Sequence, residues 1–124
     1  MKIYRTVAKV ACLLMMAMLV TSCASKEAMN LKIHTEPEGS HIVYRVALED
    51  MEQDPPWVYL GVTPYQGLTL MDPDAFSEDA TITFKVMRHG YMDQVKEWSG
   101  EQFLLEYENE NRLFWTPRLV KAGK

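Results

Sequence analysis

Alternation of apolar and polar residues predicts half-buried β-strands over much of this chain. The clearest is Ala80–Arg88, where Ile82, Phe84 and Val86 share one face, because successive side chains of a strand point to opposite sides. Residues 92–99 are expected to pair back with it after a turn at 89–91. Further strands are predicted at residues 31–35, 41–48 and 57–61, with a brief one at 68–70.

Turn residues separate these strands. Pro37 and Gly39 interrupt the chain after the first strand, since proline presets φ and glycine accepts positive φ. The strands at 31–35 and 41–48 are therefore expected to form either a hairpin or a corner at which the chain changes sheet. Residues 49–56 and 71–79 are acidic and predict exposed loops, the second with one turn of helix.

The hydrophobic period changes after Ser99. Ser99 and Gln102 have the spacing of a capping box, and apolar residues follow at helical spacing over 103–107. We expect a short helix over 100–108 and an extended segment over 112–120. Several short strands with one helix predict a mainly β fold, namely a small antiparallel β-sandwich with one short C-terminal helix.

The first 22 residues have a different pattern. Lys2, Arg5 and Lys9 precede eleven consecutive apolar residues, Val10–Val20, and small residues follow. A basic start, a short apolar core and a small-residue exit are typical of a helical signal peptide. The apolar run is shorter than the about 20 residues that a membrane-spanning helix needs.

The exit from this segment resembles the lipobox of bacterial lipoproteins. Val20, Thr21 and Ser22 precede Cys23, with valine where leucine is more usual. The resemblance implies cleavage between Ser22 and Cys23 and fatty acyl chains on Cys23. Two or three chains on one residue anchor a protein firmly without a spanning helix. Ala24, in place of an aspartate, favours the outer over the inner membrane in a Gram-negative cell.

The chain then divides into a signal peptide (1–22), a lipidated tether (23–30), one β-sandwich domain (31–120) and a tail (121–124). Cleavage after Ser22 leaves 102 residues, with ten basic and seventeen acidic side chains and a net charge of −7. An acidic surface does not suit nucleic acid, whose binding proteins need positive patches. Cys23 is the only cysteine of the mature chain, so no intramolecular disulfide can form.

Three short motifs resemble the PEGA family, in the stretches LKIHTEPEGSHIVY, LGVTP and ITFKVMRHGY. The resemblance covers residues 31–98 and implies a transthyretin-like β-sandwich without catalytic activity. The acidic insertion at 49–56 departs from the tight turn that the family has there. The residues that match are architectural, and they are Pro37, Glu38, Gly39, Gly61, Thr63, Pro64, Gly90 and Tyr91.

Candidate chemistry is sparse. His34, Glu36, Glu38 and His41 flank a turn without a known metal-ligand spacing, and no nucleophile motif accompanies His89. The acidic residues of 49–54 lack the ligand series and glycine of a calcium-binding loop. We therefore predict no enzyme, no cofactor and no metal site.

The aromatic residues are the best candidates for ligand contacts. Core packing is the simpler role for each ring, but Tyr59 and Tyr65 are the two that we expect to be exposed. The sequence thus predicts a non-catalytic, lipid-anchored envelope protein that acts as a scaffold or accessory for another envelope protein. The alternative is a module that binds peptidoglycan or another surface glycan through exposed aromatic rings.

Overall fold

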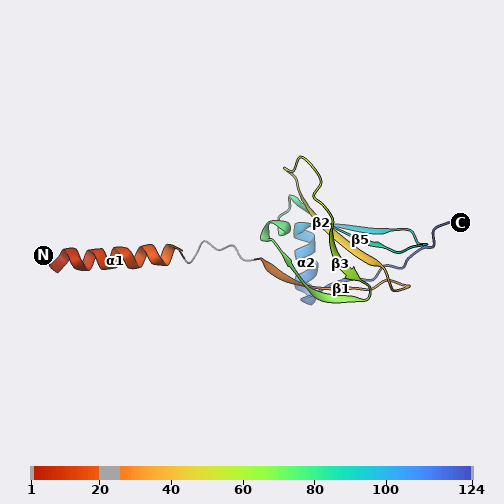
Figure 1. Ribbon diagram of the computed structural model, residues 1–124, viewed down its shortest axis with the longest axis horizontal. Coiled ribbons are helices and arrows are strands. Elements are labelled where there is room, and N and C mark those ends of the chain that lie inside the picture. Colours follow the sequence, from red (N-terminus) through yellow and green to blue (C-terminus); the bar gives the residue numbers. More distant parts are fainter. Residues whose placement is uncertain (1, 20–25, 124) are drawn as a thin grey trace.

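The computed structural model describes residues 2–19 and 26–123 (Figure 1). The predicted N-terminal helix is present as α1 (Lys2–Leu19), and no helix among the described residues is long and apolar enough to cross a membrane. Ser22 and Cys23, on which the predicted cleavage and lipid attachment fall, lie outside the described residues.

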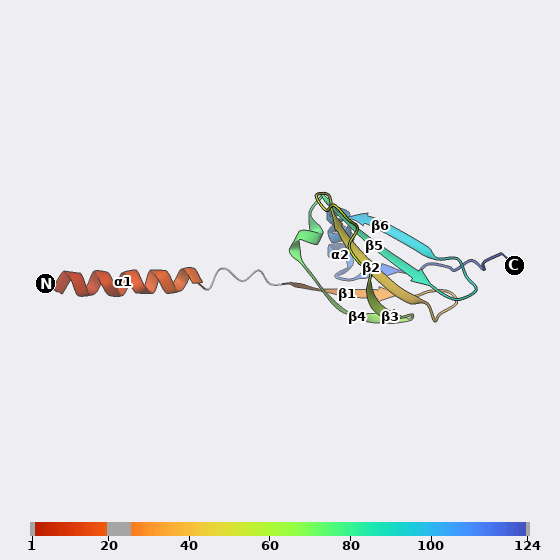
Figure 2. The ribbon, with the colours of Figure 1, turned by 45° about the horizontal axis from the view of Figure 1, so that its top comes forward.

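Within the described residues, seven strands form two sheets packed face to face, which confirms the predicted small β-sandwich (Figures 1 and 2). One sheet has the order β4-β1-β7 and the other β3-β2-β5-β6. The strands are β1 (Glu27–Ile33), β2 (His41–Leu48), β3 (Val58–Val62), β4 (Tyr65–Met71), β5 (Ala80–Met87), β6 (Gln94–Ser99) and β7 (Leu113–Trp115).

The turn after β1 is a corner between sheets, not a hairpin, because β1 and β2 belong to different sheets. Pairing is antiparallel throughout except between β1 and β7, which run parallel. Strand β1 also begins at Glu27, four residues before the predicted start. Met29 is buried on the same face as Leu31, so residues 27–30 belong to the sheet rather than to the predicted tether.

The strand pairing gives the domain two ends. At the end that we call proximal, the first residue of β1 pairs with the last residue of β4, and the last residue of β2 pairs with the first residue of β5. A 3₁₀ helix, η1 (Pro73–Phe76), also follows β4 there, as expected for the second acidic loop. The opposite, distal end carries the turns after β1, β3 and β5 (Figure 2).

Helix α2 (Gly100–Glu110) begins with the predicted capping box. The Gln102 N–H donates to Ser99 Oγ at 3.2 Å, and the Ser99 N–H donates to Gln102 Oε1 at 3.4 Å. The helix ends at Asn111, whose backbone is left-handed. Its first residue is glycine for a packing reason, since a Cβ on Gly100 would overlap the backbone oxygens of Ala75, within η1, and Ser77, directly after it.

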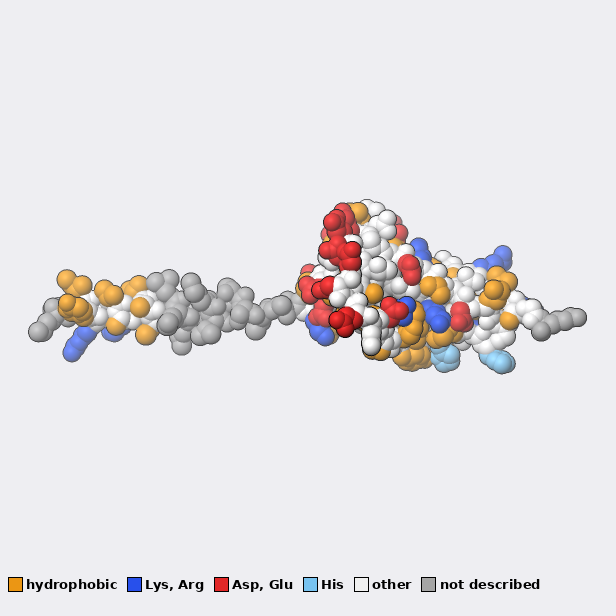
Figure 3. Space-filling model, turned by 90° about the horizontal axis from the view of Figure 1, so that it is seen from above, with side chains coloured by type: hydrophobic (Ala, Val, Ile, Leu, Met, Phe, Trp, Pro, Cys, Tyr) orange, Lys and Arg blue, Asp and Glu red, His pale blue; other side chains and the backbone are white. Residues whose placement is uncertain are grey.

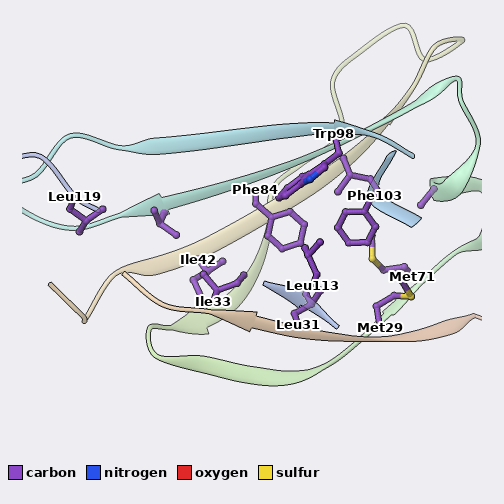
Figure 4. Packing of buried hydrophobic residues seen from close by; sticks show 13 residues of the cluster. Met29, Leu31, Ile33, Ile42, Met71, Phe84, Trp98, Phe103, Leu113 and Leu119 are labelled. Carbon is purple, nitrogen blue, oxygen red and sulfur yellow. The ribbon is translucent and has the colours of Figure 1, made fainter. Parts of the chain in front are cut away.

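The core between the sheets is apolar and rich in aromatic rings (Figure 4). Phe84 of β5 and Phe103 of α2 are fully buried, and Trp98 of β6 meets both rings edge-on with centroid distances of 5.6 Å. Such edge-to-face pairs stabilise beyond their area of burial. Helix α2 therefore belongs to the core of the sandwich, although it lies outside both sheets.

Candidate functional site

The residues of the first two motifs, which form the turns after β1 and β3, meet at the distal end around Thr63. The Thr63 hydroxyl oxygen accepts from the N–H groups of Gly39 (3.0 Å) and Ser40 (2.9 Å) and lies 2.6 Å from the Thr35 hydroxyl. The bonds preceding Pro37 and Pro64 are both cis. Thr35, Ser40 and Thr63 are buried, so this cluster joins the two sheets and leaves no open polar site.

The remaining motif residues serve backbone geometry in the same region. Gly39 and Gly90 have φ values of 100° and 85°, which favour glycine. The guanidinium of Arg88 donates to the Glu38 carbonyl at 2.5 Å and lies 5.3 Å from the centroid of the Tyr91 ring. These contacts connect the Gly-Tyr turn to the first motif. Gly61, in turn, faces the Tyr65 ring, which a Cβ at this position would approach to 3.2 Å.

The two predicted ligand contacts lie on different surfaces. Tyr59 is 57% exposed, and its hydroxyl is 3.0 Å from His41 Nδ1. Tyr65 is half-buried against the core, because its ring fits between Gly61 and Gly67. The two rings therefore do not form one exposed aromatic face.

Trp57, the ring nearest to Tyr59 in sequence, is already engaged. The Arg45 guanidinium lies 4.3 Å from its ring centroid and Lys85 Nζ lies 5.3 Å from it. Cations at such distances are attracted to the ring. They occupy space over the indole that a sugar ring would need.

A pocket of about 330 Å³ opens at the proximal end between the edge strands of the two sheets. Its walls come from β2, the 51–56 loop, β3, β4 and η1. The lining is mostly apolar, and a few charged groups stand among it. The apolar members are Val46, Leu48, Met51, Pro55, Pro56, Val58, Leu70, Met71 and Ala75, and the polar ones are Lys26, Tyr44, Arg45, Asp72 and Asp74.

The surface beside this apolar pocket is also apolar. Leu68 and Leu70 are 69% and 62% exposed on the outer side of β4, at the free edge of its sheet. Met51 and Val58, which line the pocket, are also exposed. These exposed apolar residues make this surface a candidate interaction site.

Tyr44 is the neutral polar group of the apolar pocket. Its ring stacks on Phe84 with centroids 5.5 Å apart, and its hydroxyl has no hydrogen-bond partner in the part of the chain that the structure describes. Burial, the negative charge of Asp72 and the nearby Tyr65 raise the pKa of this hydroxyl. The phenol is therefore protonated at neutral pH and can donate a hydrogen bond.

An acidic hollow of about 430 Å³ adjoins the apolar pocket and shares Leu48 and Asp74 with it. Its other lining residues are Glu49, Asp50, Ser77 and Asp79. Figure 3 shows acidic side chains gathered at this end of the domain. Within residues 2–19 and 26–123, no group of three potential metal ligands comes together.

The chain matches no protein family, no curated protein and no solved structure. Function has to be inferred from its own residues and geometry. Sequence reasoning named neither the apolar pocket nor the acidic hollow. The signal available for the pocket was the alternation of Leu68 and Leu70 with Thr69 in the segment 65–71, which places two leucines on an outer strand face.

Proposed function

We propose that this protein is a lipid-anchored protein of the bacterial envelope that acts without catalysis, as a scaffold or accessory that docks another envelope protein. The observation that carries the docking role is the apolar pocket with its exposed rim of Met51, Val58, Leu68 and Leu70. Burying apolar surface of this kind against a partner is favourable, because it removes that surface from water. The PEGA-like motifs, which are architectural here, support a binding domain rather than an enzyme.

The anchor half of the proposal is supported by the N-terminal sequence. A signal-peptide pattern ends in Val20-Thr21-Ser22-Cys23, and acyl chains on Cys23 would hold the domain at a membrane. Strand β1 begins only four residues later, at Glu27. Four residues span at most about 14 Å, so the anchor would keep the proximal end, with its apolar pocket, close to the lipid.

A glycan-binding module remains the second candidate because Tyr59 is exposed on the outer face of the four-stranded sheet. Two observations make glycan binding the weaker of the two proposals. Tyr65 is half-buried and packs against the core, and Trp57 has Arg45 over its ring. The Tyr59 ring by itself offers little area for stacking on a sugar.

Photo-crosslinking in living cells tests the docking surface. A photoreactive phenylalanine analogue at Met51 or Val58 of the intact protein is expected to give one discrete adduct with a second protein, because both positions line the apolar pocket and are exposed. The matched control is Val95, which is 54% exposed on β6, away from the pocket. Mass spectrometry of the adduct identifies the partner.

Protein adducts from Val95 in equal yield would contradict a specific surface at the proximal end. An adduct with peptidoglycan from position Tyr59, without a protein adduct from Met51 or Val58, would replace the docking proposal with the glycan-binding one.

A further inference from the structure

The apolar pocket and the acidic hollow lie against each other and share two lining residues. Leu48 of β2 and Asp74 of η1 contribute to both. A group that fills the pocket is therefore next to the carboxylates of the hollow. A ligand that suits both parts has an apolar portion directly beside a cationic portion.

The apolar pocket has the size and lining for one bulky side chain. Its volume of about 330 Å³ is at the lower end of the range for ligand sites, about 300–1,000 Å³. Proline rings and branched side chains form much of the wall. The Tyr44 hydroxyl has no hydrogen-bond partner among the described residues, so it can donate to a carbonyl of the occupant. Exposed apolar residues at the rim extend the contact to a short peptide segment.

The negative charge of the hollow determines which residue of the occupant suits the position next to the apolar side chain. Glu49, Asp50, Asp74 and Asp79 line it, and none of the ion pairs found within residues 26–123 involves these carboxylates. Two cations line the pocket, Lys26 and Arg45, but neither lines the hollow. Arg45 is also close to Asp54 (3.9 Å) and to the Trp57 ring. The hollow therefore complements a positive charge and disfavours a negative one.

We propose that this bipartite site binds a partner segment in which a bulky apolar residue stands next to lysine or arginine. The apolar side chain enters the pocket, and the basic side chain lies over the carboxylates of the hollow. The inference rests on the proposed docking function and defines the chemistry of its partner.

Titration with a short peptide tests the site. The probe is acetyl-Gly-Lys-Leu-Lys-Gly-amide, added at millimolar concentration to the full-length ¹⁵N-labelled protein in non-ionic detergent. Saturable amide shifts are expected at residues that line the pocket and the hollow. Two comparison peptides separate the contribution of the apolar side chain from that of the positive charge. One replaces leucine by glycine, and the other replaces both lysines by glutamate. Both are expected to bind more weakly.

Paired variants test the charge. Changing Asp74→Asn and Asp79→Asn together is expected to lower the affinity for the lysine peptide by about fivefold at low salt. Added salt should reduce this difference in affinity. The matched control changes Glu108→Gln and Glu110→Gln, two exposed carboxylates of α2 outside both lining sets. This control is expected to bind as the unchanged protein does.

Equal binding of the lysine and glutamate peptides, or equal loss in both paired variants, would overturn the bipartite site. If a protein adduct still forms at Met51 or Val58, the docking function stands and only its partner chemistry is wrong. If neither adduct nor peptide binding is found, the docking function fails as well.

Discussion

Replacing Phe103 by alanine is expected to lower the free energy of unfolding by about 3–5 kcal/mol. The ring is fully buried and packs on Trp98, Phe84 and Phe76, with centroid distances of 5.6, 6.1 and 6.2 Å. Alanine leaves a cavity at the point where α2 joins the two sheets. Urea unfolding followed by tryptophan fluorescence measures the loss, since Trp98 lies against the altered site.

The matched control for Phe103→Ala is Leu105→Ala on the same helix. Leu105 is exposed, so its truncation is expected to change the free energy of unfolding by no more than about 0.5 kcal/mol. Similar losses for both variants would mean that α2 does not contribute to the core as the structure shows.

Replacing Thr63 by valine is expected to cost about 1–3 kcal/mol of stability, although the two side chains have nearly the same shape. The Ser40 N–H donates to the Thr63 hydroxyl at 2.9 Å inside the protein, and the Thr35 hydroxyl also bonds to it. Valine removes the acceptor and leaves the buried N–H unpaired. Thermal and urea unfolding of the variant measure the effect.

Thr69→Val is the control for Thr63→Val. Thr69 is also buried, but its hydroxyl has no hydrogen-bond partner among the described residues. Removing an unsatisfied buried hydroxyl is expected to leave stability unchanged or to raise it. A loss at Thr69 as large as that at Thr63 would show that the cluster around Thr63 has no special role.

Much of the fold could be predicted where a single segment carries its own signal. The alternation in Ala80–Arg88 predicted β5, and Ser99 with Gln102 predicted the start of α2. Local patterns specify these elements because the strand period and the capping geometry involve neighbouring residues only. The turn at Pro37 and Gly39 was also predicted from neighbouring residues, whereas the choice between a hairpin and a corner was left open.

Features that depend on distant segments were not predicted. The parallel pairing of β7 with β1 joins Leu113 to Leu31, and no local pattern of residues 112–120 specifies that partner. Tyr65 was expected to be exposed because it follows a corner, yet two glycines make room for its ring. The apolar pocket combines residues from Lys26 to Ala75, so it exists only after the sheets have packed.

The mass of the mature protein extracted from its native membrane tests the central claim most directly. We expect a chain that begins at Cys23 and carries the mass of two or three fatty acyl chains. The Cys23→Ala variant is expected to retain residues 1–22 and to carry no acyl mass. An unmodified chain in both samples, with the same N-terminus, would contradict the lipid anchor and the membrane location of the docking surface.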